Sequence, residues 1–193
     1  MFGFLKDRSY DIVKMFLYQI AIALFGISLA IATGSKSTST DTSAFQPATL
    51  QIVTSVFSIL FYLFLIYNLL WNIGAKDAHR FARKEPGVYR LAGLYMGLAA
   101  SVVNVLIAIL IMLGNLLSSV PFFSNAGGIA ATLGLLIEGM YTGLLAIRVG
   151  GVPLNSLWPM WFVIILPMIA TASLAYFAGL HEFRIFAPVD KNQ

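Results

Sequence analysis

Residues 127–148 read GGIAATLGLLIEGMYTGLLAIR, an apolar stretch that carries one carboxylate, Glu138, near its middle. A helix of about 20 residues crosses a hydrocarbon core of about 30 Å. Four further apolar runs of similar length occur in the chain, so the sequence predicts an all-α bundle of about five transmembrane helices. The predicted spans are residues 13–33, 50–73, 91–114, 128–148 and 157–180.

The composition of the chain agrees with a protein surrounded largely by lipid. Hydrophobic residues make up 59% of the 193 residues, and charged residues only 10%, against about 25% in soluble domains. Five spans leave no room for a separate soluble domain. Residues 1–193 are therefore predicted to form a single integral membrane domain.

The first span follows a basic leader, and Ala30-Ile31-Ala32 resembles a signal-peptidase site. The apolar stretch of this span is longer than the apolar region of a signal peptide. We therefore expect it to remain in the protein as a membrane helix.

The distribution of basic residues predicts the orientation of the spans. An N-terminus inside the cell leaves most Lys and Arg on the cytoplasmic side, as the positive-inside rule requires, and this predicts a multi-pass protein of the bacterial inner membrane. An odd number of spans then places the C-terminus outside. The cytoplasmic set is Lys6, Arg8, Lys14, Lys76, Arg80, Arg83, Lys84, Arg90 and Arg148, and the outer set is Lys36, Arg184 and Lys191.

Glu138 is the main candidate for a functional residue. A charged side chain at the centre of a bilayer costs at least about 2.5–3.5 kcal/mol, so such residues face the bundle interior, pair, or stay protonated. Arg148 lies ten residues away, about 15 Å along a helix, too far for a salt bridge. One interpretation is a proton, cation or substrate site. The other is a protonated acid that bonds across helices and serves only assembly.

Matching residues by depth in the membrane predicts partners for Glu138. Ser101 falls about level with it, and Asn104 lies one turn further out. Ser28, Ser58 and Thr171 lie at a depth similar to that of Asn104. We therefore predict a binding layer of Glu138, Ser101 and Asn104, with the hydroxyl groups as further candidates. The alternative for Asn104 is a helix-to-helix hydrogen bond, and for each Ser or Thr a bond to its own helix.

Small residues recur at four-residue spacing in three of the spans. The pairs are Gly26 with Ala30, Gly93 with Gly97, and Gly139 with Gly143. This spacing allows two helix backbones to approach closely. We expect contacts within the chain, with contacts between copies in a homo-oligomer as the alternative. Pro159 and Pro167 are expected to bend the fifth span.

The segment 74–90 is the most basic part of the chain. It is expected to contain one or two helical turns lying flat on the membrane, before Pro86. Its cations are predicted either to fix topology or to contact anionic lipid or a cytoplasmic protein. The residues assigned to this contact are Lys76, Arg80, Arg83 and Lys84.

Several classes of function lack any support in the sequence. Without cysteine there are no disulfides and no thiolate metal site. The motifs of zinc proteases, P-loop enzymes and serine hydrolases do not occur. We expect no enzyme activity, no metal site and no cofactor, and the position of the basic residues beside the spans argues against nucleic acid as a partner.

One resemblance adds to this interpretation. The stretch Tyr10-Asp11, Lys14, Gln19 and Leu24-Phe25-Gly26, with WNIGAKD at residues 71–77, resembles an uncharacterised family of small bacterial integral membrane proteins. The resemblance covers the first two spans and implies the membrane class without implying an activity.

Two functional hypotheses follow from the sequence. The first is a transporter-like protein or membrane subunit with a mid-membrane site around Glu138. The second is a scaffold that binds a partner through the basic segment. A substrate-capturing subunit of a multi-protein importer lies between the two.

Overall fold

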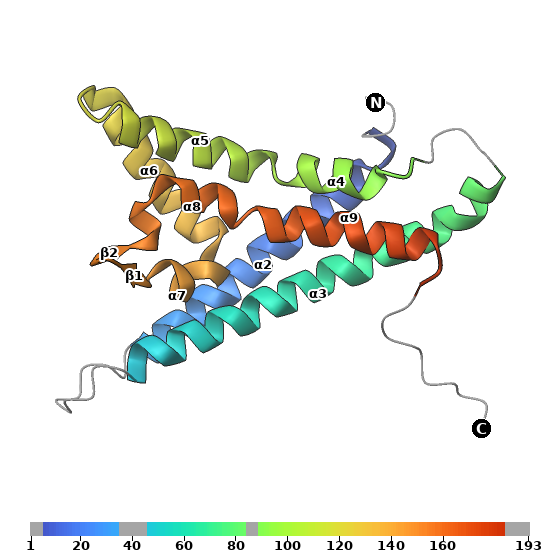
Figure 1. Cartoon of the computed structure of the whole chain (residues 1–193), viewed down its shortest axis with the longest axis horizontal. Coiled ribbons are helices and arrows are strands. Elements are labelled where there is room, and N and C mark those ends of the chain that lie inside the picture. Colours follow the sequence, from blue (N-terminus) through green and yellow to red (C-terminus); the bar gives the residue numbers. More distant parts are fainter. Residues whose placement is uncertain (1–5, 35–45, 84–88, 184–193) are drawn as a thin grey trace.

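The structure is a computed structural model, which describes residues 6–34, 46–83 and 89–183. The described chain is almost entirely helical, as predicted, with one two-residue strand pair (Figure 1). The elements are α2 (Ser9–Gly34), α3 (Gln46–Ala82), α4 (Ala92–Ala100), α5 (Val102–Leu116), α6 (Pro121–Ile137), η2 (Gly139–Tyr141), α7 (Thr142–Leu145), β1 (Arg148–Val149), β2 (Val152–Pro153), η3 (Leu154–Ser156), α8 (Trp158–Val163) and α9 (Leu166–Leu180), where η marks a 3-10 helix.

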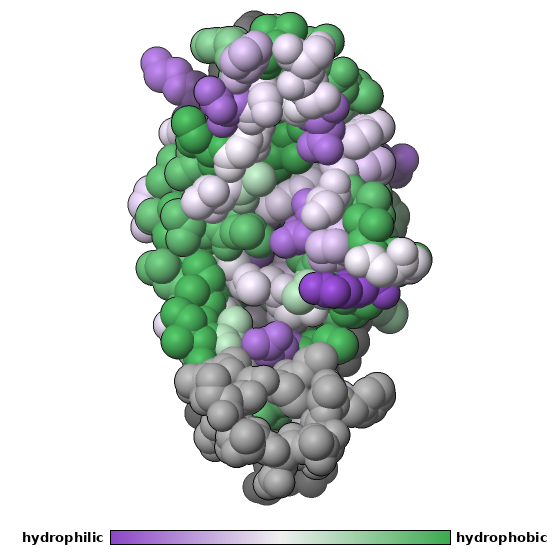
Figure 2. Space-filling view, turned by 90° about the vertical axis from the view of Figure 1, so that its left-hand side faces the viewer, coloured by the Kyte–Doolittle hydropathy of each residue, from purple (hydrophilic) through white to green (hydrophobic). Residues whose placement is uncertain are grey.

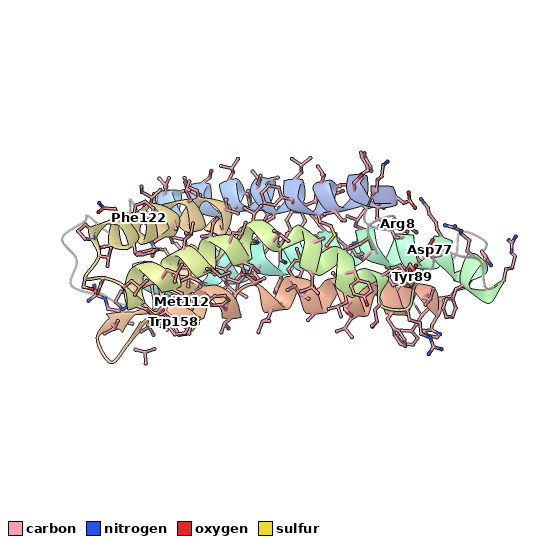
Figure 3. The ribbon with its side chains drawn as sticks, turned by 90° about the horizontal axis from the view of Figure 1, so that it is seen from above. Arg8, Asp77, Tyr89, Met112, Phe122 and Trp158 are labelled. Atoms are coloured by element: carbon pink, nitrogen blue, oxygen red, sulfur yellow. The ribbon has the colours of Figure 1, made fainter. Side chains whose placement is uncertain are left out.

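The helices form an elongated bundle with two distinct ends. Arg8, Asp77 and Tyr89 lie at one end, here called the N-terminal end, and Met112, Phe122 and Trp158 lie near the other (Figure 3). The β1–β2 hairpin also lies at this second end, here called the hairpin end (Figure 1). Three helical segments are long and apolar enough to cross a membrane: residues 9–32, 49–82 and 158–180.

The outer surface of the bundle is strongly apolar. Large hydrophobic side chains are exposed on every long helix, among them Leu24, Phe61, Leu106, Leu133 and Leu174. A water-soluble protein would not expose so much apolar surface. The molecule therefore has the helices and the surface expected of a membrane protein.

The predicted third span is bent at Ser101. The two helices α4 and α5 meet there at 51°. The Ser101 hydroxyl donates to the carbonyl of Gly97 at 2.8 Å, and the Ser101 N–H also bonds this carbonyl at 3.0 Å. Such a bond from a serine to its own helix favours bending.

The predicted fourth span, 128–148, differs most from the sequence expectation. Its helix begins earlier, at Pro121, and ends at Ile137, and α6 and α7 then meet at 84°. The chain enters from the hairpin end, turns at Glu138 in the middle of the bundle, and returns to the hairpin end at β1 (Figure 1). Residues 121–147 therefore turn back toward the end of the bundle from which they came, in place of one straight span, and are here called the re-entrant hairpin.

Close contacts at glycine hold the tip of this re-entrant hairpin. A Cβ on Gly139 would lie 2.6 Å from the carbonyl oxygen of Ala23 in α2, and one on Gly143 would lie 2.1 Å from that of Gln51 in α3. Gly26 faces the backbone of Met140 in the same way. These glycines therefore form tight contacts within the chain, as expected from their spacing.

The re-entrant hairpin changes the expected position of the C-terminal helix. The return strand pair turns at Gly150 and Gly151, which both have positive φ, as two-residue β-turns require. The last helices, α8 and α9, then run from the hairpin end to the N-terminal end (Figure 1). Arg148 therefore lies at the end away from Arg8, and Leu180, at the end of α9, lies near Arg8, which reverses the expected sides of these two residues. The C-terminus itself lies outside the described residues.

Proline affects the last span at one of the two predicted positions. The helix is interrupted between Val163 and Leu166, one turn before Pro167, where the missing proline N–H leaves a carbonyl without its helical donor. Pro159 lies in the first turn of α8, a position that tolerates proline without bending.

We predict that the contact between α3 and α9 cannot tolerate a methyl group. A Cβ on Gly179 would lie 2.2 Å from the carbonyl oxygen of Trp71, and overpacking of this kind costs about 1–3 kcal/mol. Gly179→Ala should therefore lower the melting temperature in detergent by roughly 2–10 °C. Gly128→Ala is the matched control, since a Cβ there meets nothing within 4 Å. Equal melting temperatures for both variants would contradict the contact.

Candidate functional site

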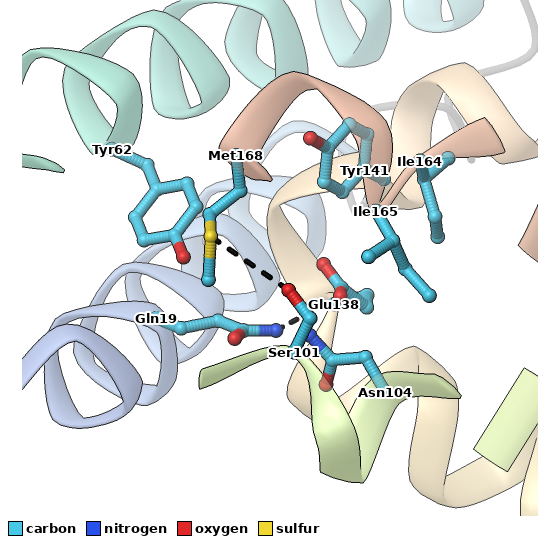
Figure 4. Close-up of a pocket in the computed structure, with 9 residues that line it drawn as sticks. All are labelled: Gln19, Tyr62, Ser101, Asn104, Glu138, Tyr141, Ile164, Ile165 and Met168. Atoms are coloured by element: carbon cyan, nitrogen blue, oxygen red, sulfur yellow. Dashed lines mark hydrogen bonds between the residues drawn. The ribbon is translucent and has the colours of Figure 1, made fainter. Parts of the chain in front are cut away.

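The bend at Glu138 gathers polar side chains from four parts of the bundle. Gln19 comes from α2, Tyr62 from α3, Ser101 and Asn104 from the α4–α5 bend, and Glu138 and Tyr141 from the tip of the re-entrant hairpin. Figure 4 shows these six side chains around one point. We call them the Glu138 cluster.

The Glu138 cluster is closed to solvent. Glu138 is 5% exposed and Gln19 is 1% exposed. The Gln19 amide donates from Nε2 to Oε1 of Glu138 at 2.9 Å. Ile164, Ile165 and Met168 complete the lining of this small space.

Four buried polar atoms of the cluster find no hydrogen-bond partner among the described residues. They are Oε1 of Gln19, Oδ1 of Asn104 and the hydroxyl groups of Tyr62 and Tyr141. Most buried polar atoms in proteins are hydrogen-bonded, and each exception costs about 1–3 kcal/mol. The cluster therefore carries unused hydrogen-bonding and ligating capacity at the centre of an apolar bundle.

The electrostatic environment of the cluster is negative. Among the described residues that line it, none is Lys, Arg or His. The C-terminal end of α6 lies at Glu138, and that of α4 lies at Ser101. Because the C-terminus of a helix carries a partial negative charge, both helix ends add to the charge of a carboxylate at Glu138. The arrangement therefore favours a positively charged ligand beside Glu138.

The three residues predicted as a binding site lie together in the cluster. Glu138, Ser101 and Asn104 all line the same small space. The other hydroxyl groups of the predicted layer do not line it: Ser28 is exposed and bonds the carbonyl of Leu24, Ser58 bonds the carbonyl of Thr54, and Thr171 is partly buried elsewhere on α9.

Depth matching alone did not identify Gln19, Tyr62 and Tyr141. Gln19 is a lone amide in the apolar first span, and this isolated polar side chain was a signal that could have identified a buried partner of Glu138. Tyr141 follows Glu138 by three residues, and this spacing placed both on one helix face. Tyr62 carried no comparable signal, because tyrosine is common both in apolar interiors and at interfaces. The assignment of Tyr62 needed the packing of α3 against the re-entrant hairpin.

A second buried carboxylate lies at the N-terminal end. Asp77 of α3 is 3% exposed and pairs with Arg8, while Arg80 lies 3.7 Å away. The Tyr176 hydroxyl of α9 donates to Oδ2 of Asp77 at 3.1 Å. Arg8, Asp77, Arg80 and Tyr176, here the Asp77 cluster, therefore join the start of the chain, α3 and α9.

Burial alone would lower the pKa of the Arg8 guanidinium. Its hydrogen bond to Asp77 and the charges of Asp77 and Asp11 outweigh this effect and raise the pKa above its usual value. Arg8 therefore stays charged at all physiological pH values.

The residues predicted for partner or lipid contact lie near this end. Lys76 and Arg80 are exposed on α3, which runs without interruption to Ala82, and Arg83 follows it. The expected short helix lying flat on the membrane is therefore wrong for these residues, because they continue the axis of the long helix (Figure 1). Lys84 lies outside the described residues.

Comparisons with protein-family models, curated proteins and solved structures give no match. The resemblance to small bacterial membrane proteins stays a prediction. The interpretation of the site therefore rests on its geometry.

We predict that the Asp77 cluster stabilises the N-terminal end. Asp77→Ala removes the shared acceptor of Arg8 and Tyr176, and breaking a buried ion pair costs about 3–5 kcal/mol. The partial exposure of Arg8 places the expected loss near the lower value. Asp11→Ala is the control, since Asp11 lies 3.7 Å from Arg8 at a more exposed position. Thermal unfolding in detergent should show a clearly larger loss for Asp77→Ala, and equal losses would contradict a structural role of Asp77.

Proposed function

We propose that this chain is a small transporter-like membrane protein, or the membrane subunit of a transporter, and that the Glu138 cluster is its site for a proton, a cation or a small solute. The observation that carries this proposal is the set of four unpartnered polar atoms around a buried carboxylate. A site that served only assembly would gain most from satisfying these atoms. Instead, they remain available to a ligand.

The re-entrant hairpin supports the same proposal. Backbone that leaves the regular helix at membrane depth is tolerated where it is buried in protein or lines a cavity. In transporters, interrupted helices form sites near the bilayer midplane, with C-terminal helix ends directed at cations. The turn at Glu138 places a helix end and a carboxylate together in this way.

The charge distribution supports an orientation in the membrane. Seven described Lys and Arg lie near the N-terminal end, namely Lys6, Arg8, Lys14, Lys76, Arg80, Arg83 and Arg90, and among the described residues only Arg148 lies at the hairpin end. By the positive-inside rule, the N-terminal end faces the cytoplasm of a bacterial inner membrane. In this arrangement the three straight spans and the one bent span make four crossings, and the re-entrant hairpin makes none. Both termini would then lie inside.

This orientation predicts the outcome of reporter fusions in a bacterial host. A green fluorescent protein fused after Gln193 should fluoresce, because it would fold in the cytoplasm. Alkaline phosphatase inserted between Gly150 and Gly151 should be active, because this turn would lie outside. A fluorescent insertion at the turn together with an active phosphatase at the C-terminus would contradict the four-crossing arrangement.

Glu138→Gln tests the proposed site. The variant keeps the shape of the side chain and removes its charge, so it should lower the flux of H⁺, Na⁺ or K⁺ at least tenfold. Flux is measured with ion-sensitive dyes in membrane vesicles from expressing cells, where partner subunits remain present. Glu182→Gln is the control, because Glu182 is exposed beyond α9.

The scaffold hypothesis predicts the opposite result. There, Glu138→Gln would leave function intact, since the partner would bind the exposed Lys76, Arg80 and Arg83. Equal flux for the wild type and Glu138→Gln in the same vesicles would therefore contradict the transport proposal and favour the scaffold.

A further inference from the structure

One face of α3 changes from polar to apolar halfway along the helix. Gln51, Ser55, Ser58 and Tyr62 follow one another at spacings of four, three and four residues, which places them on a single helix face. The next positions on this face are Ile66, Leu70 and Ile73, all buried. The polar half points from the hairpin end to the Glu138 cluster, and the apolar half lies between the cluster and Asp77.

The polar half of this face is buried against the re-entrant hairpin. Ser55 and Ser58 are 5% and 0% exposed. The backbone N–H of Gly143 donates to the Ser55 hydroxyl at 2.8 Å, and Gly143 belongs to the four-residue helix α7. A line of hydroxyl groups therefore connects the Glu138 cluster with Gln51, which is partly exposed at the hairpin end.

Hydrophilic side chains also gather on the surface of the hairpin end. Figure 2 shows the hairpin end, where hydrophilic side chains gather between bands of hydrophobic ones. Exposed polar residues of the described chain at this end include Asn115, Asn125, Arg148 and Ser156.

On the basis of the proposed function, we infer that the ligand of the Glu138 cluster is an alkali-metal cation of the size of sodium, and that it enters from the hairpin end along the polar face of α3. The route follows Ser55 and Ser58 beneath α7. Because Gly143 packs directly against Gln51 and Ser55, the route opens only when α7 moves away from α3. The apolar half of the face blocks passage toward the Asp77 cluster.

The chemistry of the cluster selects this class of ion. The unpartnered amide oxygens of Gln19 and Asn104 are acceptors only. Rotation of the Gln19 amide by 180° turns its oxygen toward Glu138 in place of its nitrogen. Together with the carboxylate and the Ser101 hydroxyl, the two amide oxygens form an all-oxygen set, which hard cations prefer. A proton would use only one of these oxygens and leave the others unpartnered.

Other ligand classes fit the cluster less well. Anions are excluded by the carboxylate and by the negative helix ends described above. Divalent cations usually require more acidic ligands, and the described residues hold no group of three or more His, Asp or Glu side chains suited to a metal. The described lining holds one carboxylate, Glu138, which balances a single positive charge.

The absence of cysteine from the chain allows a direct test by single substitutions. Ser58→Cys lies on the polar half of the face, Leu70→Cys on the apolar half, and Ser156→Cys is an exposed control at the hairpin end. Silver ions, which are small cations that react with thiols, are applied to intact cells or to inverted membrane vesicles. Thiols that remain free after quenching and denaturation are counted by a gel shift with maleimide-polyethylene glycol.

We expect Ser58→Cys to react with silver only from the hairpin side, and at least fivefold more slowly in sodium chloride than in choline chloride. Leu70→Cys should stay unreacted from both sides. In the double variant that adds Glu138→Gln, sodium should no longer slow the reaction. This last comparison depends on ion binding and would not change if Glu138 were only structural.

Three outcomes would overturn the inference. Reaction of Ser58→Cys from the cytoplasmic side, or no reaction while Ser156→Cys reacts fully, would exclude the route. Protection by acidic pH without an effect of sodium would replace the alkali cation by a proton. These failures are separate from a failure of the proposed function, which is measured independently as unchanged flux in Glu138→Gln.

Discussion

The close approach of backbone at glycine is the constraint on which the rest of the structure depends. Gly139 and Gly143 bring the tip of the re-entrant hairpin against α2 and α3, at separations that no side chain would allow. This contact fixes how deep the hairpin reaches, and therefore places Glu138 in the interior. It also lets the short segments η2 and α7 satisfy backbone groups away from water, for example through the bond from Gly143 to Ser55.

The sequence predicted the fold class. It did not predict the direction in which the chain runs through the bundle. Apolar length identifies segments that suit a membrane, and this part of the prediction is confirmed. Hydropathy contains no information about direction, so a run of about 20 residues that turns back at Glu138 looks the same as one that crosses. The extension of α6 back to Pro121 was also hidden, because residues 115–127 lack charge and resemble a polar loop.

The candidate site was predictable to the extent that its polarity was unusual. Glu138 stands out in any apolar run, and Ser101 and Asn104 followed from their depth. Gln19 required knowledge that α2 lies against the turn. The polar face of α3 was readable from the periodicity of residues 51, 55, 58 and 62, although serine and tyrosine are common enough in membrane helices that the pattern gains meaning only beside the cluster.

The two buried carboxylates have opposite environments, and this difference bears on their roles. Asp77 lies among two arginines and a tyrosine hydroxyl, so its charge is compensated by the protein, as in a structural ion pair. Glu138 receives one amide hydrogen bond and faces two helix C-termini, so its compensating charge must come from a proton or a bound cation. Because Gly74 and Gly179 hold α3 tightly against α9 at the N-terminal end, opening the bundle there would have to separate these helices and break the Asp77 cluster. At the hairpin end, a ligand that reaches Glu138 has to displace the four-residue helix α7 and separate Gly143 from Gln51 and Ser55, while the ion pairs of the Asp77 cluster stay intact.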